Sequence, residues 1–229
     1  MDGSASYDST GRFLEQGLLE ANTRNNYLLS RKKRCLDIVG AASIGLFFSP
    51  VIFVVTAILA FQKGPIVFGH ERIGYRGKQF CCYKFRSMVP EAEQVLQDLL
   101  DNDAEARLEW DKDFKLKKDP RVTRVGAFLR KTSLDELPQL WNVLKGDMSL
   151  VGPRPIVREE LLRYGRGARF YMSTCPGLTG LWQVSGRNDI SYARRIAMDR
   201  AYAENATLGV DIRLILRTVL VVIGMKGSY

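Results

Sequence analysis

The chain has 229 residues, with 34 lysines and arginines against 25 aspartates and glutamates, which gives a formal net charge of +9. Its 46% hydrophobic content excludes a wholly disordered chain and suits one compact domain with an appended membrane element. The single histidine, His70, excludes a multi-histidine metal site, and four cysteines without C-x-x-C spacing indicate free thiols in a reducing cytoplasm.

The first segment, residues 1–30, is polar and mixed in charge, and this composition predicts a flexible or weakly helical leader. The second segment, residues 31–63, contains a run without any charged side chain from residue 38 to residue 61. This run exceeds the roughly 18 apolar residues that mark a membrane helix. It also begins too late and is too long for a signal peptide.

Two features of the apolar run favour a hairpin that enters and leaves the same face of a membrane. Ser49 and Pro50 lie at its middle, where proline bends a helix, so each arm reaches through about half of a ~30 Å hydrocarbon layer. Basic residues precede the run at 31–34 and follow it from Lys63 onward, and a full span would place one group outside, against the positive-inside preference. We therefore expect residues 31–63 to form a re-entrant membrane helix, with a plain single span as the alternative.

Residues 64–229 are expected to form a domain that faces the cytosol. It begins with a short β-hairpin at residues 64–86, indicated by two apolar strands around a glycine-bounded turn. On the second strand, a period of two places Lys84 and Arg86 on one face, either as solvated cations or as a shelf for phosphate. Apolar spacing then predicts one packing helix over residues 90–110.

Reactive groups are densest around Asp135 and Glu136. Ser133 and Glu136 have the spacing of a capping box, so the structural interpretation is an ordinary helix N-terminus. The functional alternative is an Asp135 kept ionised beside the cations Arg130 and Lys131, which would be a usable nucleophile toward phosphorus. Glutamate beside it could help hold a divalent ion, and oxygen ligands alone select Mg²⁺ over zinc.

Gly146 is predicted to end the helix that follows this region. Arg154 lies between two prolines, which either prepare it for two-point phosphate contact or make a rigid turn with a solvated arginine. A glycine-rich stretch, residues 175–189, allows backbone to approach a ligand and contributes Arg187. The apolar residues 208–225 suit a helix lying in the membrane interface, with core packing as the alternative.

Together these residues resemble the bacterial sugar transferases, also called monotopic phosphoglycosyl transferases, from residue 31 to residue 229. The motifs that carry the resemblance are Ser49-Pro50 and residues 83–88 (YKFRSM), 130–140 (RKTSLDELPQL), 146–155 (GDMSLVGPRP), 176–180 (PGLTG) and 186–188 (GRN). The resemblance is to short-form members that initiate exopolysaccharide synthesis. It implies an α+β, mostly helical fold with a re-entrant membrane helix hairpin, a small cytoplasmic catalytic domain with a short β-hairpin, and interfacial amphipathic helices.

The resemblance also implies an activity, in which hexose 1-phosphate passes from a UDP-sugar to undecaprenyl phosphate with release of UMP. By the matching motifs, Asp135 is implied as the nucleophile of a covalent phosphosugar intermediate and Glu136 as its partner, both near Mg²⁺. Ser49 and Pro50 would hold the membrane bend. The cations implied to bind substrate are Lys84, Arg86, Arg130, Arg154 and Arg187.

The implied location is the bacterial inner (cytoplasmic) membrane, with the catalytic domain facing the cytoplasm. Membrane lipids are then partners, nucleic acid is not, a homodimer is compatible, and the sugar is galactose or glucose. Two other function classes stay open from the residues alone. One is a membrane-anchored polyanion-binding module without catalysis, which the interleaving of cations with carboxylates disfavours. The other is a glycosyltransferase that moves only the sugar and releases a nucleoside diphosphate.

Overall fold

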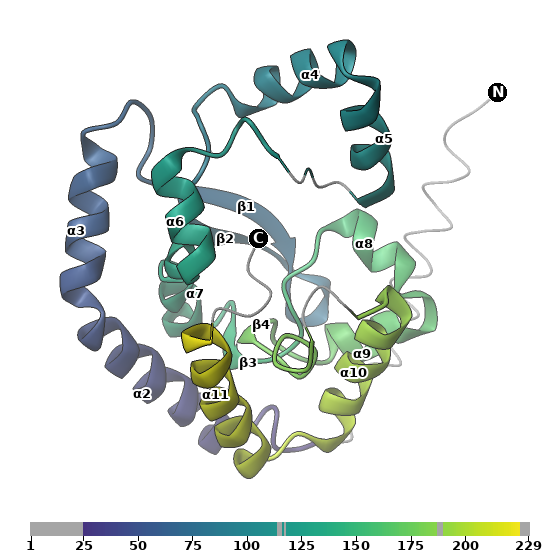
Figure 1. Ribbon diagram of the computed structural model, residues 1–229. Coiled ribbons are helices and arrows are strands. Elements are labelled where there is room, and N and C mark those ends of the chain that lie inside the picture. The colour runs from purple at the N-terminus through teal and green to yellow at the C-terminus, as the bar shows by residue number, and fades with distance from the viewer. Residues whose placement is uncertain (1–24, 114–115, 117, 187–189, 225–229) are drawn as a thin grey trace.

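The computed structural model describes residues 25–113, 116, 118–186 and 190–224, and Figure 1 shows how their elements are arranged. The α-helices are α2 (Arg31–Phe47), α3 (Ser49–Ala60), α4 (Ala92–Asn102), α5 (Ala104–Asp113), α6 (Arg124–Thr132), α7 (Gln139–Lys145), α8 (Arg158–Arg163), α9 (Ala168–Met172), α10 (Tyr192–Asn205) and α11 (Leu208–Ile223). The strands are β1 (Val67–Ile73), β2 (Gln79–Phe85), β3 (Ser149–Val151) and β4 (Gly177–Thr179), and the 3-10 turns are η1 (Tyr75–Gly77), η2 (Leu134–Glu136) and η3 (Gly165–Gly167). The expected α+β, mostly helical fold is confirmed.

Helices α2 and α3 form a bent pair, inclined by 63° at a break of one residue, Phe48. Pro50 lies in the first turn of α3, where its missing N–H breaks no helical bond, and the Ser49 hydroxyl donates to the Leu46 carbonyl at 2.8 Å. Within the described part of the chain, no single helix is long and apolar enough to cross a membrane, whereas the two arms taken together are. The predicted bend at Ser49-Pro50 is confirmed.

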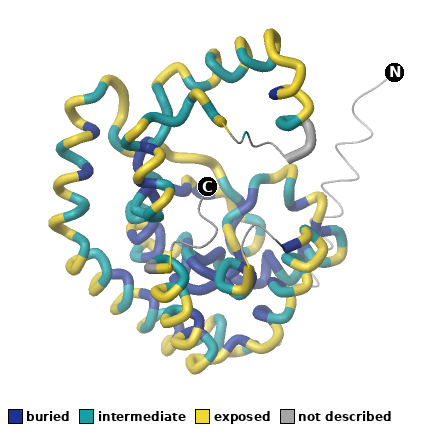
Figure 2. The backbone as a smooth tube through the Cα atoms, viewed as in Figure 1, coloured by how far each residue is buried: buried dark blue, intermediate teal, exposed yellow. Residues whose placement is uncertain are grey.

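One side of α3 packs against the body of the protein, and the other is apolar and exposed. Val55 and Leu59 are buried beside Phe85 and Leu129. On the opposite side Phe53 is 74% exposed, and Figure 2 shows exposed positions along both arms. Large exposed apolar surfaces mark sites of contact with lipid or with other proteins.

The predicted hairpin is formed by β1 and β2, which pair antiparallel from Val67 opposite Phe85 to Ile73 opposite Gln79. The turn between them places Arg76 and Gly77 at positive φ, as a tight connection requires. His70 lies exposed within β1, and all four cysteines are free thiols, as expected from the sequence.

The second sheet, which the sequence patterns did not predict, pairs β3 with β4 in parallel and lies inside the largest core. Ser149 is opposite Gly177, and Val151 is opposite Thr179. The residues buried in this core are Ala41, Phe80, Cys82, Leu140, Val143, Met148, Leu150, Val151, Tyr202, Ala206 and Leu214. They come from α2, β2, α7, α11 and the segments that contain β3 and α10, so the first helix of the bent pair is part of the same core as α11.

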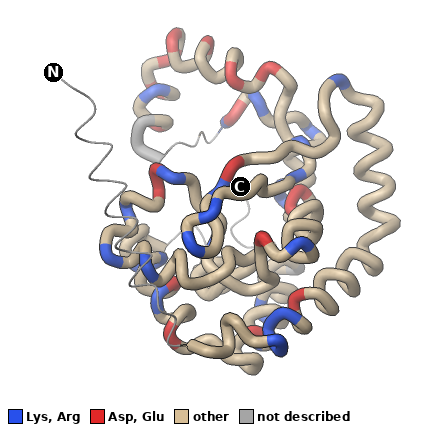
Figure 3. Tube along the Cα trace, turned by 180° about the vertical axis from the view of Figure 1, so that it is seen from behind, with Lys and Arg blue, Asp and Glu red and all other residues tan. Residues whose placement is uncertain are grey.

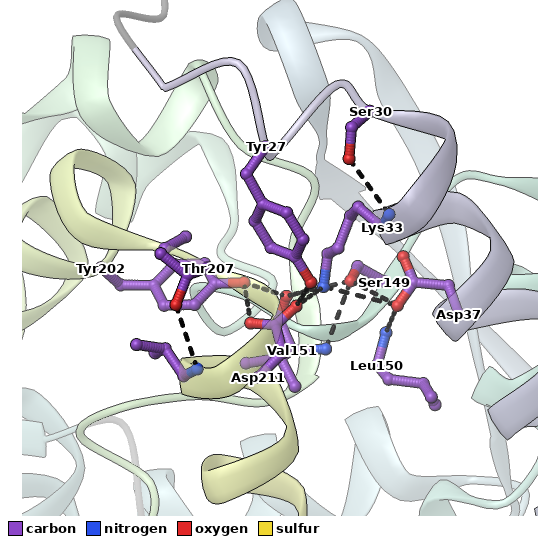
Figure 4. Close-up of polar contacts among 12 residues, drawn as sticks. Tyr27, Ser30, Lys33, Asp37, Ser149, Leu150, Val151, Tyr202, Thr207 and Asp211 are labelled. Carbon is purple, nitrogen blue, oxygen red and sulfur yellow. Dashed lines mark hydrogen bonds and ion pairs between the residues drawn. The ribbon is translucent and has the colours of Figure 1, made fainter.

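A buried polar network joins α2, β3, α10 and α11, and its centre is the ammonium group of Lys33 (Figure 4). Lys33 Nζ lies 2.6 Å from Asp211 Oδ2 on α11, 3.4 Å from Asp37 Oδ1 on its own helix, and 3.1 Å from the Val151 carbonyl oxygen on β3. The Lys33 side chain is 5% exposed. A buried ammonium group needs such partners because its desolvation is costly.

The two carboxylates around Lys33 are themselves fully engaged. Asp211 accepts hydrogen bonds from the hydroxyls of Tyr27 and Tyr202, each at 2.8 Å. Asp37 accepts from the Ser149 hydroxyl at 2.9 Å and from the Leu150 N–H at 3.0 Å. The network therefore fixes α2 and α11 against the strand β3.

The predicted single helix at residues 90–110 is wrong, because α4 and α5 are separate helices that break at Asp103. Asp103 is extended, and its side chain accepts a hydrogen bond from the Ala106 N–H, which is the capping contact that starts a new helix. The pair is acidic, as Figure 3 shows, although the chain as a whole is basic.

Helix α11 has one face in the core, and its other face is apolar and exposed. Leu214 is buried in the core, whereas Leu216 and Leu220 are 61% and 71% exposed. One face of α11 therefore packs on β3 and β4, and the opposite face presents leucines outward.

The first prediction concerns Lys33. Replacing it, Lys33→Met, leaves two buried carboxylates without their cation, and we expect a loss of about 3–5 kcal/mol in the free energy of unfolding. The control is Arg200→Met, which breaks an exposed pair with Glu204 and should cost less than about 1 kcal/mol. Thermal and denaturant unfolding in lipid nanodiscs measure both variants, and equal losses would contradict a stabilising role for the network.

The second prediction concerns Asp199 on α10, which is 2% exposed and accepts a hydrogen bond from the Tyr164 hydroxyl at 2.8 Å. Burial raises the pKa of Asp199 from 3.8 to about 7. The folded state therefore holds this proton more tightly than the unfolded state, so the stabilisation is complete below pH 3.8 and is lost as the pH rises to 7.

Because of Asp199, we expect the free energy of unfolding to fall by up to about 1.4 kcal/mol for each unit by which the pH rises across that window. Asp199→Asn keeps an acceptor for Tyr164 and should remove this slope. Melting temperatures of both proteins between pH 4 and 8 test the assignment, and parallel curves would refute it.

Candidate active site

Asp135 is presented by a sharp turn between two helices. Helix α6 ends at Ser133, which adopts a left-handed conformation with φ of 58°, and η2 then carries Asp135 and Glu136. The capping box is not formed, because Ser133 makes no side-chain cap bond and α7 begins only after Pro138. A left-handed serine is costly and persists only where its surroundings fix it.

The apolar neighbours of Asp135 anchor this turn to α3. Leu134 and Leu137 pack in the cluster that contains Val55 and Leu59 of α3. Because the two leucines occupy the side of the turn that faces α3, the two carboxylates face the hairpin strand β2.

Lys84 on β2 meets both carboxylates. Its ammonium nitrogen lies 2.7 Å from Glu136 Oε1 and 3.6 Å from Asp135 Oδ2. Asp135 is 7% exposed. Burial raises the pKa of its carboxyl group; Lys84 and Arg130 oppose this shift, and the negative charge of Glu136 adds to it.

The expected effect of a positive helix end on Asp135 is therefore small. The turn η2 is a single 3-10 turn, and desolvation outweighs the neighbouring cations in setting the direction of the pKa shift. Arg130 is close enough to interact with Asp135 electrostatically, and its guanidinium donates to the Ser87 hydroxyl at 2.9 Å.

A hollow opens beside the carboxylates. Its lining residues are Arg72, Cys82, Lys84, Glu136, Gln139, Arg154, Pro155, Gly177, Leu178 and Gln183. Burial raises the pKa of the Cys82 thiol to about 11, so it stays protonated and is a poor nucleophile. The carboxylates beside Lys84, Glu136 in the lining and its neighbour Asp135, are therefore better candidates for nucleophilic chemistry than Cys82.

Two arginines face this hollow. Burial, and then the nearby charge of Arg154, lower the pKa of Arg72. Neither guanidinium makes an ion pair with a carboxylate among the residues that the structure describes. Two guanidinium groups at one surface, without an ion pair to a described carboxylate, are suited to bind a phosphate or diphosphate. The motifs did not single out Arg72, because its partner is 82 positions away on another element.

A closely packed stretch of backbone fixes the position of Arg154. It follows β3 through Gly152 and the fully buried Pro153. A Cβ atom at Gly152 would lie 2.3 Å from the Cys175 carbonyl oxygen, and one at Gly177 would lie 2.1 Å from the Gly152 nitrogen. Only glycine fits at these two contacts, so the strand end that carries Arg154 is fixed.

A scan against protein families finds that residues 28–225 match the model of the bacterial sugar transferases. The chain belongs to the bacterial sugar transferase family.

Three bacterial sugar transferases illustrate the range of relatives. The chain is 54% identical over 197 residues to the undecaprenyl-phosphate galactose phosphotransferase of Salmonella typhimurium, which covers 86% of this chain and 41% of the relative. It is 48% identical over 198 residues to the exopolysaccharide production protein ExoY of Rhizobium meliloti, covering 86% and 88%. It is 37% identical over 207 residues to the UDP-glucose:undecaprenyl-phosphate glucose-1-phosphate transferase of Klebsiella pneumoniae, covering 86% and 41%. The chain thus spans less than half the length of some relatives and most of the length of ExoY.

The candidate site of this family member brings together most of the residues singled out in the sequence. Lys84, Glu136 and Arg154 line one hollow, with Asp135 and Arg130 adjoining it. Arg187 lies outside the described residues.

Arg86 is a correction to the predicted set of substrate-binding cations. It is 7% exposed, and its guanidinium donates to the carbonyl oxygens of Lys63 and Leu59 at the end of α3. Its cation caps the C-terminal end of α3 instead of sharing a phosphate shelf with Lys84.

The carboxylate pair fits Mg²⁺ of the kind that binds together with a substrate. Mg²⁺ in enzymes is usually held by one or two carboxylates, several waters and the substrate phosphates. Asp135 and Glu136 would supply the protein oxygens. Across the described residues, no group of three histidine, cysteine or acidic side chains could make an all-protein metal site.

Proposed function

We propose that this protein transfers hexose 1-phosphate from a UDP-sugar to undecaprenyl phosphate through a covalent intermediate on Asp135. The observation that carries the proposal is the buried Asp135, held beside Lys84 and Glu136 at the edge of a hollow that also contains Arg154. The printed names of the relatives add support, because they contain undecaprenyl phosphate, UDP-glucose and galactose phosphotransferase. Galactose and glucose are the candidate sugars.

In the first step the donor diphosphate binds to the arginines of the hollow. A carboxylate oxygen of Asp135 attacks the phosphorus that carries the sugar, and the bond from that phosphorus to the bridging oxygen breaks. UMP leaves with the bond electrons, and hexose phosphate stays on Asp135 as an acyl phosphate. Lys84 balances the negative charge of the carboxylates, which would otherwise repel the donor.

In the second step a phosphate oxygen of the lipid attacks the same phosphorus, and the Asp135 carboxylate is the leaving group. The product is a lipid-linked diphosphate sugar, and Asp135 returns to its starting state. Mg²⁺ bound with the substrate would neutralise phosphate charge next to Asp135 and Glu136. Covalent storage lets one small site treat a soluble donor and a lipid acceptor in turn.

The proposed location is the cytoplasmic membrane, with the catalytic domain on the cytoplasmic side. Support comes from the exposed apolar faces of the bent pair and of α11, where Phe61, Leu46, Phe47 and Leu220 are examples that are more than 70% exposed. Because α3 also packs on η2, a bent pair dipping into the inner leaflet would hold Asp135 near the headgroups of the acceptor. The net charge of +9 favours both anionic lipids and anionic donors.

The third prediction tests the nucleophile. Asp135→Asn removes the attacking carboxylate, and we expect transfer to fall by roughly a thousandfold or more, with no phosphosugar adduct. Glu136→Gln keeps the nucleophile and should leave weak activity, reduced by roughly a hundredfold. Asp98→Asn, on the exposed surface of α4, is the matched control and should act like the wild type.

Radiolabelled UDP-galactose or UDP-glucose with undecaprenyl phosphate in nanodiscs gives the rate, and mass spectrometry of quenched enzyme gives the adduct. A fully active Asp135→Asn protein would defeat the covalent mechanism. Release of UDP in place of UMP would favour simple sugar transfer, and binding without any lipid product would favour a polyanion-binding module.

The fourth prediction tests the topology. Single cysteines at Asn26 and Gln62, on either side of the bent pair, should both react with an impermeant thiol reagent from the cytoplasmic side of sealed vesicles. The native cysteines are replaced first, and the protein must retain transferase activity. Labelling from opposite sides would restore a single transmembrane span.

A further inference from the structure

The side chain of Gln183 leaves one buried hydrogen-bond acceptor without a donor. Gln183 lines the hollow, and its buried side-chain oxygen Oε1 has no hydrogen-bond partner among the residues that the structure describes. Its amide nitrogen donates to the Leu178 carbonyl oxygen at 3.2 Å. That bond decides which end of the amide is nitrogen, so Oε1 is the atom that stays unpaired.

The surroundings of Gln183 hold its oxygen in place. A Cβ atom at Gly180 would lie 2.9 Å from Oε1 and 2.3 Å from the Gly152 carbonyl oxygen. Gly152 also begins the fixed connection that carries Arg154. The preceding residue, Trp182, is buried and has the Arg195 guanidinium 4.6 Å from its ring centroid. Relaxation of Gln183 toward another partner would therefore disturb a packed backbone.

A buried unpaired acceptor costs free energy that a ligand carrying a matching donor recovers. We infer that Gln183 Oε1 is a specificity-determining contact, which accepts a hydrogen bond from an N–H or O–H group of the nucleotide sugar. The inference rests on the proposed function, because it is the donor diphosphate on Arg72 and Arg154 that brings such a group into the same hollow. The donor group is the imide N–H of the uracil or a hydroxyl of the hexose.

This contact selects among substrates by rejection. A nucleotide or sugar that lacks the donor leaves Oε1 buried and unpaired, and sites built to accept a hydrogen bond discriminate strongly against such analogues. Arg72 and Arg154, by contrast, bind any diphosphate. In this scheme the two arginines bind the charged diphosphate, and the Gln183 amide selects the group that is attached to it.

The fifth prediction measures this contact by binding. Calorimetry of the full chain in nanodiscs, with Asp135→Asn present to prevent turnover, compares Gln183→Met with the matched control Gln94→Met on the exposed surface of α4. We expect the Kd for the UDP-sugar to rise roughly tenfold in Gln183→Met and to stay unchanged in the control. A loss for UDP as well assigns the contact to the uracil, whereas a loss for the UDP-sugar alone assigns it to the hexose. Unchanged Kd values for both ligands overturn the inference.

Substrate analogues test the same contact on the protein with its native Gln183, so this second test does not depend on a variant that folds. N3-methyl-UDP is compared with UDP, and UDP-sugars lacking one hydroxyl are compared with the complete sugar. One of these should bind roughly tenfold more weakly, and full affinity for all of them overturns the inference. Transfer by the wild type is assayed separately. Normal transfer by the wild type together with an unchanged Kd in Gln183→Met therefore refutes only this inference. Absent transfer by the wild type with intact binding of the UDP-sugar refutes the proposed reaction.

Discussion

The ammonium group of Lys33 is the contact on which the arrangement of this protein depends. It is removed from water on α2, the first helix of the bent pair, and it is compensated by Asp211 on α11 and by the Val151 carbonyl on β3. Such a charge tolerates few alternative positions, because moving either helix would leave a buried ion without a partner. The network therefore does more than add stability: it defines how the bent helix pair is positioned on the rest of the protein.

The position of the bent helix pair determines both the arginine side and the carboxylate side of the site. Strand β3 continues through Gly152 and Pro153 to Arg154, so the strand that Lys33 holds also carries an arginine of the hollow. The second arm packs its buried face against Leu134 and Leu137, which flank the carboxylates on η2. The same hairpin that exposes apolar residues outward thus supports the anion-binding side and the carboxylate side of the site.

The cations and carboxylates of the site are not paired one to one, and this arrangement suits the binding of a phosphate group. Lys84 is shared by two carboxylates, while Arg72 and Arg154 have no carboxylate partner within the described residues. Burial makes Asp135 harder to ionise, and the cations around it work in the opposite direction. A carboxylate kept dry beside fixed cations is more reactive toward an incoming phosphorus than one in water, because less solvent must be rearranged.

The sequence by itself determined the features that are set by neighbouring residues. Pro50 predicted the helix bend, glycines predicted the hairpin turn and the end of α7, and the ordered motifs predicted the family and the grouping of Lys84, Glu136 and Arg154. Only the tertiary structure decided the partners of distant side chains. It placed Arg86 on the carbonyls that end α3, Arg72 opposite Arg154, and the unpaired oxygen of Gln183 in the hollow. The physical reason is that backbone geometry is local, whereas the compensation of a buried charge or polar atom depends on which segments the folded chain brings together.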